Sequence, residues 1–254
     1  MKRRTIALTN QKGGSGKTTS AVNLAAALGE RGRKVLVVDL DPQASASAWL
    51  GVRDGGRGLL DALTNGGSLD GLVLKTDAPG VSIVPSSSWL VGIERALAGE
   101  PGAELVLRGC LDRLPSRWDY VLLDCPPSLG LLAVSALAAA REVLVPVESH
   151  VMALHGLAHL LKTVDVVKAR LNPDLVVSGI VACRVDGRTR HSLDVVDRLR
   201  EKFGAQVFHT VIRENVRIAE APSFAQPVTL YDTKSNGAED YRALAAEVIA
   251  QENP

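Results

Sequence analysis

Short runs of apolar residues alternate along the chain with longer segments that carry apolar residues at helical spacing. Six runs predict β-strands, at residues 5–9, 34–39, 81–85, 120–124, 142–147 and 175–182. Five segments predict helices, at residues 18–31, 89–98, 103–114, 129–139 and 154–171. Strands that are apolar throughout are buried on both faces by crossover helices. We therefore expect an α/β fold in which residues 1–254 form a single domain, with a doubly wound, mostly parallel sheet flanked by helices.

The first predicted strand leads directly into the glycine-rich segment 10–19, and a predicted helix follows at once. Glycines let backbone N–H groups converge on a phosphate, and the helix adds its positive N-terminal end. In such a loop Lys17 reaches the β- and γ-phosphates and the Thr18 hydroxyl binds Mg²⁺. A glycine-rich turn without a ligand is the alternative, which the strand and helix around the loop disfavour. The residues expected to bind the nucleotide here are Lys12, Gly13, Gly14, Ser15, Gly16, Lys17, Thr18 and Thr19.

The loop departs from the strict phosphate-loop pattern, because Gln11 stands where that pattern begins with glycine, and it contains a second lysine, Lys12. The run Lys-Gly-Gly-Ser-Gly-Lys-Thr resembles the deviant Walker A motif of the ParA/MinD superfamily of dimeric ATPases. This resemblance implies a P-loop NTPase fold and ATP with Mg²⁺ as cofactors. It also implies that Lys12 reaches the phosphates of a partner subunit, so that Lys12 and Lys17 both serve catalysis. A solvated loop lysine is the plainer interpretation of Lys12.

Two acid-bearing segments extend the resemblance. Residues 35–43 look like the family's second strand and first switch, and residues 120–129 look like its Walker B strand and second switch. Acids at the carboxyl ends of strands lie where open α/β sheets bind ligands. The resemblance implies that Asp41 positions or activates the attacking water. It also implies that Asp124 holds Mg²⁺ through water, with Thr18 as a ligand and Asp39 as a carboxylate on the metal side. Each acid taken alone could instead cap a helix or a turn.

Later segments are also similar to the family. Residues 178–186, 213–222 and 234–241 resemble a strand, the loop beside the nucleotide base and the start of the closing helix, so the similarity spans nearly the whole chain and is closest to the ParA/Soj type. Where many relatives read Pro-Arg-Asn, this chain has Arg213-Glu214-Asn215. We expect Asn215 near the base, and this departure leaves the other adenine contacts open.

The charge balance and the cysteine content disfavour several classes of protein. With 29 basic and 28 acidic side chains, the chain is neither a strongly basic nucleic-acid coat nor an acidic disordered tail. Its three cysteines form no Cys-x-x-Cys pair, which disfavours a disulfide scaffold, a zinc ribbon or a metal-cluster carrier and indicates a reducing, cytoplasmic location. A small-molecule kinase or amide ligase would fit the phosphate loop alone. It would not explain Lys12 together with residues 39–43.

Residues 181–220 contain eight basic and six acidic side chains, which on charge alone favours a mixed, solvated helical face. The resemblance implies instead that Arg188 and Arg217, with Arg190 nearby, bind double-stranded DNA without sequence preference. The expected function is an ATP-dependent dimerising switch ATPase, nucleoid-associated, that segregates or positions a chromosome, a plasmid or another large cargo. A ParB-like or other adaptor protein would stimulate its slow hydrolysis.

The alternative is a MinD-like surface switch that controls division-site or protein-cluster placement. Such a switch would want a basic amphipathic helix near its C-terminus. Residues 239–254 carry four acidic side chains against one arginine, so no membrane partner is expected.

Overall fold

The computed structural model describes residues 3–252, apart from the side chains of Val151, Met152 and His155. The strands are β1 (Arg4–Leu8), β2 (Val35–Asp39), β3 (Leu74–Lys75), β4 (Val81–Val84), β5 (Tyr120–Asp124), β6 (Glu142–Glu148), β7 (Val176–Val185) and β8 (Ile212–Arg213). They form one sheet in the order β3-β4-β2-β5-β1-β6-β7-β8. The β3–β4 pairing is antiparallel and the others are parallel. The prediction of a doubly wound, mostly parallel sheet is confirmed.

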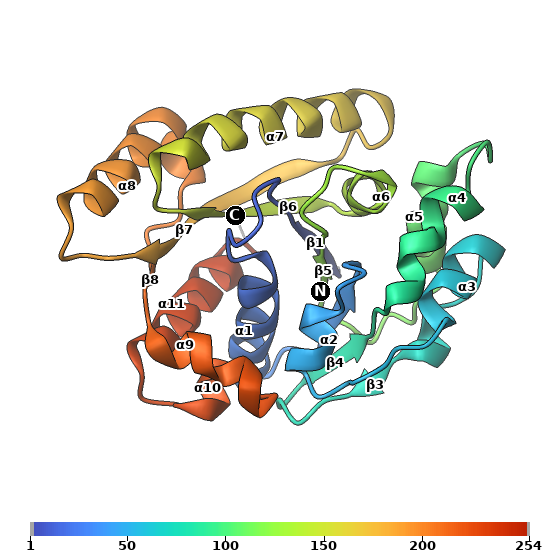
Figure 1. Ribbon diagram of the computed structural model, residues 1–254, viewed down its shortest axis with the longest axis horizontal. Helices are drawn as coiled ribbons and strands as arrows, with labels where there is room; N and C mark the ends of the chain where they lie inside the picture. The colour runs from blue at the N-terminus through green and yellow to red at the C-terminus, as the bar shows by residue number, and fades with distance from the viewer. Residues whose placement is uncertain (1–2, 253–254) are drawn as a thin grey trace.

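Helices cover both faces of this sheet. The α-helices are α1 (Lys17–Glu30), α2 (Ser45–Trp49), α3 (Gly58–Asn65), α4 (Ile93–Ala96), α5 (Val106–Asp112), α6 (Leu131–Ala139), α7 (Val151–Arg170), α8 (Arg190–Phe203), α9 (Val216–Glu220), α10 (Val228–Tyr231) and α11 (Asn236–Ala250). Short 3-10 turns are η1 (Asp70–Leu72), η2 (Ser88–Gly92), η3 (Ala103–Leu105), η4 (Gly204–Gln206) and η5 (Ala221–Phe224). Figure 1 shows α7 over β6 and β7, with α1 and α11 on the opposite side.

The alternation of side chains along each strand builds two hydrophobic cores. In β1, Ile6 and Leu8 belong to the core shared with α1 and α11, whereas Ala7 belongs to the core shared with α6 and α7. All three are completely buried, as expected for a central strand covered on both faces. Among the described residues, no helix is long and apolar enough to cross a membrane.

Two of the predicted helices are shorter than expected. Residues 89–98 form η2 followed by the single turn α4, and residues 103–114 begin as η3 before α5 starts. In the first of these, Leu90, Ile93 and Leu97 are buried, but Trp89 and Val91 are 51% and 73% exposed. Two apolar side chains of this segment therefore point to solvent. A regular helix would lack the continuous buried face that stabilises most helices, which explains the short turns found instead. Helix α8 lies in the region treated as a charged helical face and was not among the five predicted helices.

The carboxyl ends of the central strands meet at one edge of the sheet. Asp39 at the end of β2 pairs in register with Asp124 at the end of β5, and Leu8 at the end of β1 pairs with Asp124 from the other side. The glycine-rich loop therefore leaves β1 directly beside these two carboxylates. This edge is where open α/β sheets bind their ligands.

Candidate active site

The glycine-rich loop between β1 and α1 has the geometry of an anion site. Gly14 and Gly16 have φ angles of 75° and 92°, a conformation that glycine adopts without strain. Among the described residues, no side chain caps the start of α1, and the first turn holds no acid. The Ser15 hydroxyl is buried without a hydrogen-bond partner in the described part of the chain. The loop thus presents unsatisfied donors at a positive helix end, as phosphate binding requires.

The side chain of Asn10 fixes how the loop leaves β1. Its amide nitrogen donates to the Pro146 carbonyl at 2.7 Å, and its oxygen accepts from the Lys12 backbone N–H at 3.1 Å. Lys17 is only 7% exposed, and its ammonium donates to the Lys12 carbonyl at 3.2 Å. Burial lowers the pKa of Lys17, while the neighbouring Asp124 carboxylate opposes this shift. Lys17 is therefore held across the loop, next to the acids of the sheet edge.

Asp124 is the strongest indication of a cation site. Its side chain is completely buried, and neither carboxylate oxygen has a well-aligned hydrogen-bond partner among the described residues. Burial and the nearby Asp39 carboxylate raise the pKa of Asp124 well above its ordinary value, and the Thr18 hydroxyl and Lys17 partly oppose this. A buried carboxylate without partners needs an explanation. A divalent cation fits, because Mg²⁺ prefers carboxylate oxygens and keeps bound water.

Asp39 lies beside Asp124, but its oxygens are already engaged by the protein. One oxygen accepts from the backbone N–H and the hydroxyl of Ser47, at 2.8 and 2.7 Å, and the other accepts from the Asp41 N–H at 3.1 Å. Burial raises the pKa of Asp39 to about 6, although these hydrogen bonds favour its ionised form. Because its oxygens are bound by Ser47 and Asp41, Asp39 is placed to support the cation site through these residues.

Asp41 lies in the segment predicted as the first switch, and it is half-buried. Its side chain accepts from the Gln43 backbone N–H at 2.9 Å, so it also closes a turn. The turn-forming alternative weighed from the sequence is therefore present in the structure. Closing this turn does not remove Asp41 from the sheet edge, where it lies close enough to Lys17 and Asp124 to influence both pKa values.

Lys12 is directed toward an acid of its own chain. Its ammonium donates to the Glu148 carboxylate at 2.5 Å, and the lysine side chain is 42% exposed. Glu148, the last residue of β6, also pairs with Arg184 at 3.2 Å. The hydrogen bond from Lys12 and the positive charges of Lys12 and Arg184 lower the pKa of Glu148. This partner could not be predicted from the sequence, because Glu148 lies far from the loop along the chain and approaches it only through the pairing of β6 with β1.

A cavity of about 310 Å³ lies beside the phosphate loop, between the loop and the segment around α9. Asn215, which we expect near the base, lines this cavity, and its side-chain oxygen caps α9 by accepting from the Arg217 N–H at 2.8 Å. The cavity is also lined by residues that the sequence did not indicate as nucleotide contacts, namely Trp49, Cys183, Ile218 and Tyr241. Apolar and aromatic side chains with a few polar groups are what a flat nucleotide base requires.

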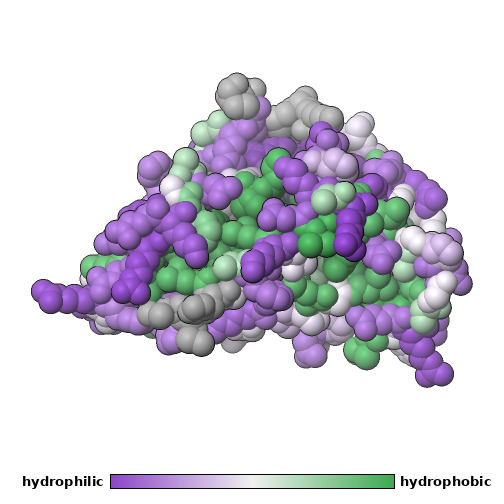
Figure 2. Space-filling view, turned by 90° about the horizontal axis from the view of Figure 1, so that it is seen from above, coloured by the Kyte–Doolittle hydropathy of each residue, from purple (hydrophilic) through white to green (hydrophobic). Residues whose placement is uncertain are grey.

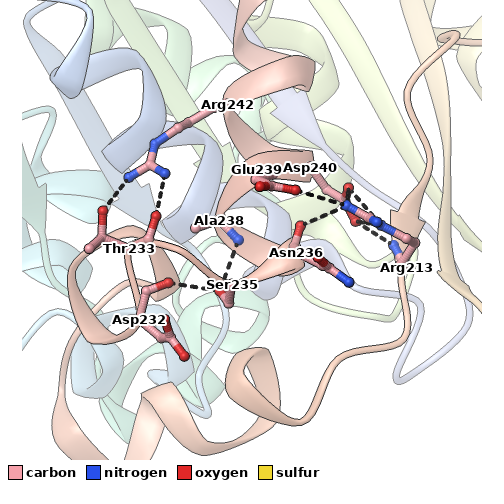
Figure 3. Close-up of polar contacts among 9 residues, drawn as sticks. All are labelled: Arg213, Asp232, Thr233, Ser235, Asn236, Ala238, Glu239, Asp240 and Arg242. Carbon is pink, nitrogen blue, oxygen red and sulfur yellow. Dashed lines mark hydrogen bonds and ion pairs between the residues drawn. The ribbon is translucent and has the colours of Figure 1, made fainter.

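Arg213 secures the base-side segment to α11, as Figure 3 shows. Its guanidinium donates to the Asp240 carboxylate at 2.6 Å and to the Asn236 carbonyl at 3.3 Å. The Ser235 hydroxyl caps α11 by accepting from the Ala238 N–H at 3.3 Å. Such a two-pronged arginine–carboxylate pair fixes geometry as well as adding energy. At this departure from Pro-Arg-Asn, an ion pair between Arg213 and Asp240 therefore holds the loop in this chain.

The three arginines predicted to contact DNA are exposed, and two of them have acidic partners. The Arg188 side chain is 87% exposed and pairs with Asp186 at 2.9 Å. Arg217 is half-exposed and pairs with Glu220 and Asp232, while Arg190 begins α8. The end of the molecule that carries α8 is covered mainly by hydrophilic side chains (Figure 2). The structure thus places all three arginines at the surface.

Comparisons with known proteins agree with this geometry. A family model described as an AAA domain, AAA_31, matches residues 3–177. The chromosome partitioning protein ParA of Myxococcus xanthus is 43% identical over 253 residues, which cover 99% of this chain and 89% of that protein. The chromosome-partitioning ATPase Soj of Thermus thermophilus is 49% identical over 248 residues, which cover 98% and 96%.

A solved structure, cobyrinic acid a,c-diamide synthase from Mycobacterium smegmatis with bound ADP and magnesium, superposes with a TM-score of 0.86. It is 33% identical and covers 98% of this chain and 95% of that one. The two relatives extend over nearly the whole chain and are well above 30% identity. The chain therefore belongs to the ParA/Soj family of partition ATPases, within the ParA/MinD superfamily.

Proposed function

We propose that this protein is the switch ATPase of a system that segregates or positions a chromosome, a plasmid or another large cargo. It is an ATPase of the partition family and uses ATP with Mg²⁺. The observation that carries the proposal is Asp124, a completely buried carboxylate without well-aligned partners among the described residues, beside Thr18 and the start of α1. A divalent cation held by Asp124 and Thr18 would give this carboxylate a partner and would supply positive charge beside the phosphate loop.

Each residue of the site has a proposed role. Thr18 and Asp124 hold Mg²⁺, with Asp39 supporting them, and the metal neutralises phosphate charge when bound. Lys17 binds the terminal phosphates, and Asp41 positions the attacking water. The proposed nucleotide contacts are Lys12, Gly13, Gly14, Ser15, Gly16, Lys17, Thr18, Thr19 and Asn215.

We further propose that ATP closes a homodimer through Lys12. The exposed Lys12 ammonium lies at the mouth of the loop and is held there by a surface ion pair with Glu148. Exposed pairs of this kind are weak, about 0.2–1 kcal/mol, so a phosphate of a second copy could displace the glutamate. Lys12 would then act in trans, while Lys17 acts on the nucleotide of its own chain.

The ATP-bound dimer is proposed to bind double-stranded DNA non-specifically through Arg188, Arg190 and Arg217. A formal net charge of +1 predicts weak binding by one copy, because non-specific affinity grows with the number of phosphates contacted. Two copies joined in one rigid body engage the duplex together and gain avidity. A ParB-like or other adaptor would then stimulate hydrolysis, and the protein would be cytoplasmic and nucleoid-associated. Residues 1–254 would work as a single ATPase domain.

Mobility shifts on unrelated duplexes test this proposal. We expect binding with a non-hydrolysable ATP analogue, little binding with ADP, and a steep loss of affinity with salt. Arg217→Glu and Arg188→Glu should weaken binding and flatten the salt dependence without affecting dimerisation. Arg170→Glu, an equal charge change at the far end of α7, is the matched control. Equal binding in both nucleotide states, or no binding by an established dimer, would favour the MinD-like surface switch instead.

A further inference from the structure

The turn after β4 contacts both the segment that follows β2 and the start of α6. The residues that make these contacts lie outside the nucleotide motifs. This turn, residues 85–94, contains η2 and the start of α4 and is called the β4 turn below. Strand β4 is the neighbour of β2, and β2 is the neighbour of β5. The β4 turn therefore starts beside the first switch segment (residues 40–43) and continues toward the second (residues 125–129).

Ser86 connects the β4 turn to the first switch segment. Its hydroxyl donates to the Asp41 carbonyl at 2.6 Å, and its backbone N–H donates to the Ser47 hydroxyl oxygen at 2.9 Å. Ser47 in turn donates to Asp39 at 2.7 Å. Ser86, Ser47 and Asp39 are all at most 1% exposed, so these hydrogen bonds are shielded from water. Polar networks that are buried and satisfied rigidify the segments they join.

Glu94 connects the other end of the β4 turn to the element that follows the second switch segment. Its carboxylate accepts from the Leu131 backbone N–H at 3.1 Å, in the first turn of α6. The approach is close, because a Cβ added to Gly130 would lie 2.4 Å from a Glu94 oxygen. A carboxylate at a helix N-terminus also interacts favourably with the helix dipole. Glu94 thus fixes the place where α6 begins, directly after the second switch segment.

Packing alone does not require these two contacts. Leu90 and Ile93 are 1% and 2% exposed and already attach the β4 turn to the core. The neighbouring serine, Ser87, donates its hydroxyl to the Gly56 carbonyl, away from both switch segments. The β4 turn therefore has its own anchors, and the bonds from Ser86 and Glu94 are additional ones directed at the switch segments.

We propose that Ser86 and Glu94 are positioning residues for ATP hydrolysis, which hold the first and second switch segments in one arrangement. The proposal rests on the proposed function, because it takes Asp41 to position the attacking water. Both residues act through the backbone of others: Ser86 through Asp41 and Glu94 through Leu131. Their loss lowers kcat and leaves nucleotide affinity unchanged, because the phosphates bind residues 12–19, which neither side chain contacts.

Steady-state ATPase kinetics and analogue binding of Ser86→Ala test the first contact. We expect kcat to fall about 10-fold, since small misplacements near the reacting atoms cost up to about 100-fold. Affinity for a non-hydrolysable analogue should stay within about twofold. Ser87→Ala removes the same hydroxyl one residue away and should retain the parental kcat. Parental kcat in Ser86→Ala, or equal losses in both variants with a lowered thermal midpoint, would overturn the proposal.

Glu94 offers a second test that does not depend on a buried site. Glu94→Ala should lower kcat at unchanged analogue affinity, and Glu94→Gln, which keeps a side-chain oxygen acceptor, should recover most of the loss. No recovery with glutamine, or no loss with alanine, would count against the second contact. Asp41→Ala separates this inference from the proposed function. If Asp41→Ala hydrolyses ATP normally, the role of Asp41 is wrong; if it is inactive while Ser86→Ala is normal, only the positioning inference fails.

Discussion

The ion pair between Lys12 and Glu148 predicts that a glutamine at position 148 promotes dimerisation. In a single chain the Lys12 ammonium contacts the Glu148 carboxylate at 2.5 Å. If Lys12 crosses to a second copy, this contact must break first. Glu148→Gln keeps the shape of the side chain and removes its charge, so Lys12 is released at lower cost.

The size of the effect follows from the exposure of the pair. The lysine and glutamate side chains are 42% and 21% exposed, which places the pair near the surface. Such pairs are worth about 0.2–1 kcal/mol, and two of them break when two copies meet, giving about 0.4–2 kcal/mol in total. We therefore expect the dimer Kd to fall by roughly 2- to 30-fold, since about 1.4 kcal/mol corresponds to a tenfold change. High salt should weaken the pair in the parental protein and reduce the difference.

Sedimentation equilibrium with a non-hydrolysable ATP analogue measures this change. Glu214→Gln is the matched control, because Glu214 pairs with Arg184, the other partner of Glu148, without contacting Lys12. It also removes a charged partner of Arg184 and should leave the dimer Kd unchanged. Lys12→Ala should fail to dimerise in either background. A dimer that is no tighter in Glu148→Gln, or equally tighter in Glu214→Gln, would refute the idea that Glu148 restrains Lys12.

Three further predictions concern the acids of the sheet edge. Asp41→Ala should bind ATP and dimerise but hydrolyse ATP poorly, which chromatography of the complex with labelled ATP would reveal; rapid conversion to ADP would contradict this. Without nucleotide or metal, the thermal midpoint should fall as pH rises from about 4 to 6 and level off above that, because burial raises the pKa of Asp39 from its ordinary 3.8 to about 6 and the folded chain therefore binds more protons between these values. Asp124→Asn should raise the midpoint at pH 7, because burial raises the pKa of Asp124 and burying this carboxyl group is therefore costly at that pH, and it should lose the extra stabilisation that Mg²⁺ with ATP gives the parental protein. A variant that is less stable in both conditions would show that Asp124 has a purely structural role.

The sequence predicted the elements whose signal is local. Strands such as β2 and β5 are unbroken apolar runs, and the phosphate loop is contiguous from residue 10 to residue 19, so both could be recognised without a structure. The helical spacing of apolar residues predicts a helix over residues 89–98, yet two of those apolar side chains, Trp89 and Val91, are exposed.

Contacts between distant segments could not be predicted from the sequence. Glu148 meets Lys12 because β6 lies beside β1, and Ser86 meets Asp41 because β4 lies beside β2. Neither Glu148 nor Ser86 lies in a local sequence pattern that distinguishes it from a solvated surface residue. Only the order of strands in the sheet brings these side chains to the site.

Charge also limits how ATP could control DNA binding. Arg188 and Arg217 each have an acidic partner in their own chain, so a single copy offers little uncompensated positive charge. Bound ATP adds negative charge to the same molecule, and its direct electrostatic effect could only weaken attraction to DNA. That effect is screened beyond about 8–10 Å at physiological salt. We therefore expect the proposed nucleotide-dependent DNA binding to arise from the joining of two copies, which places two weak arginine clusters on one body.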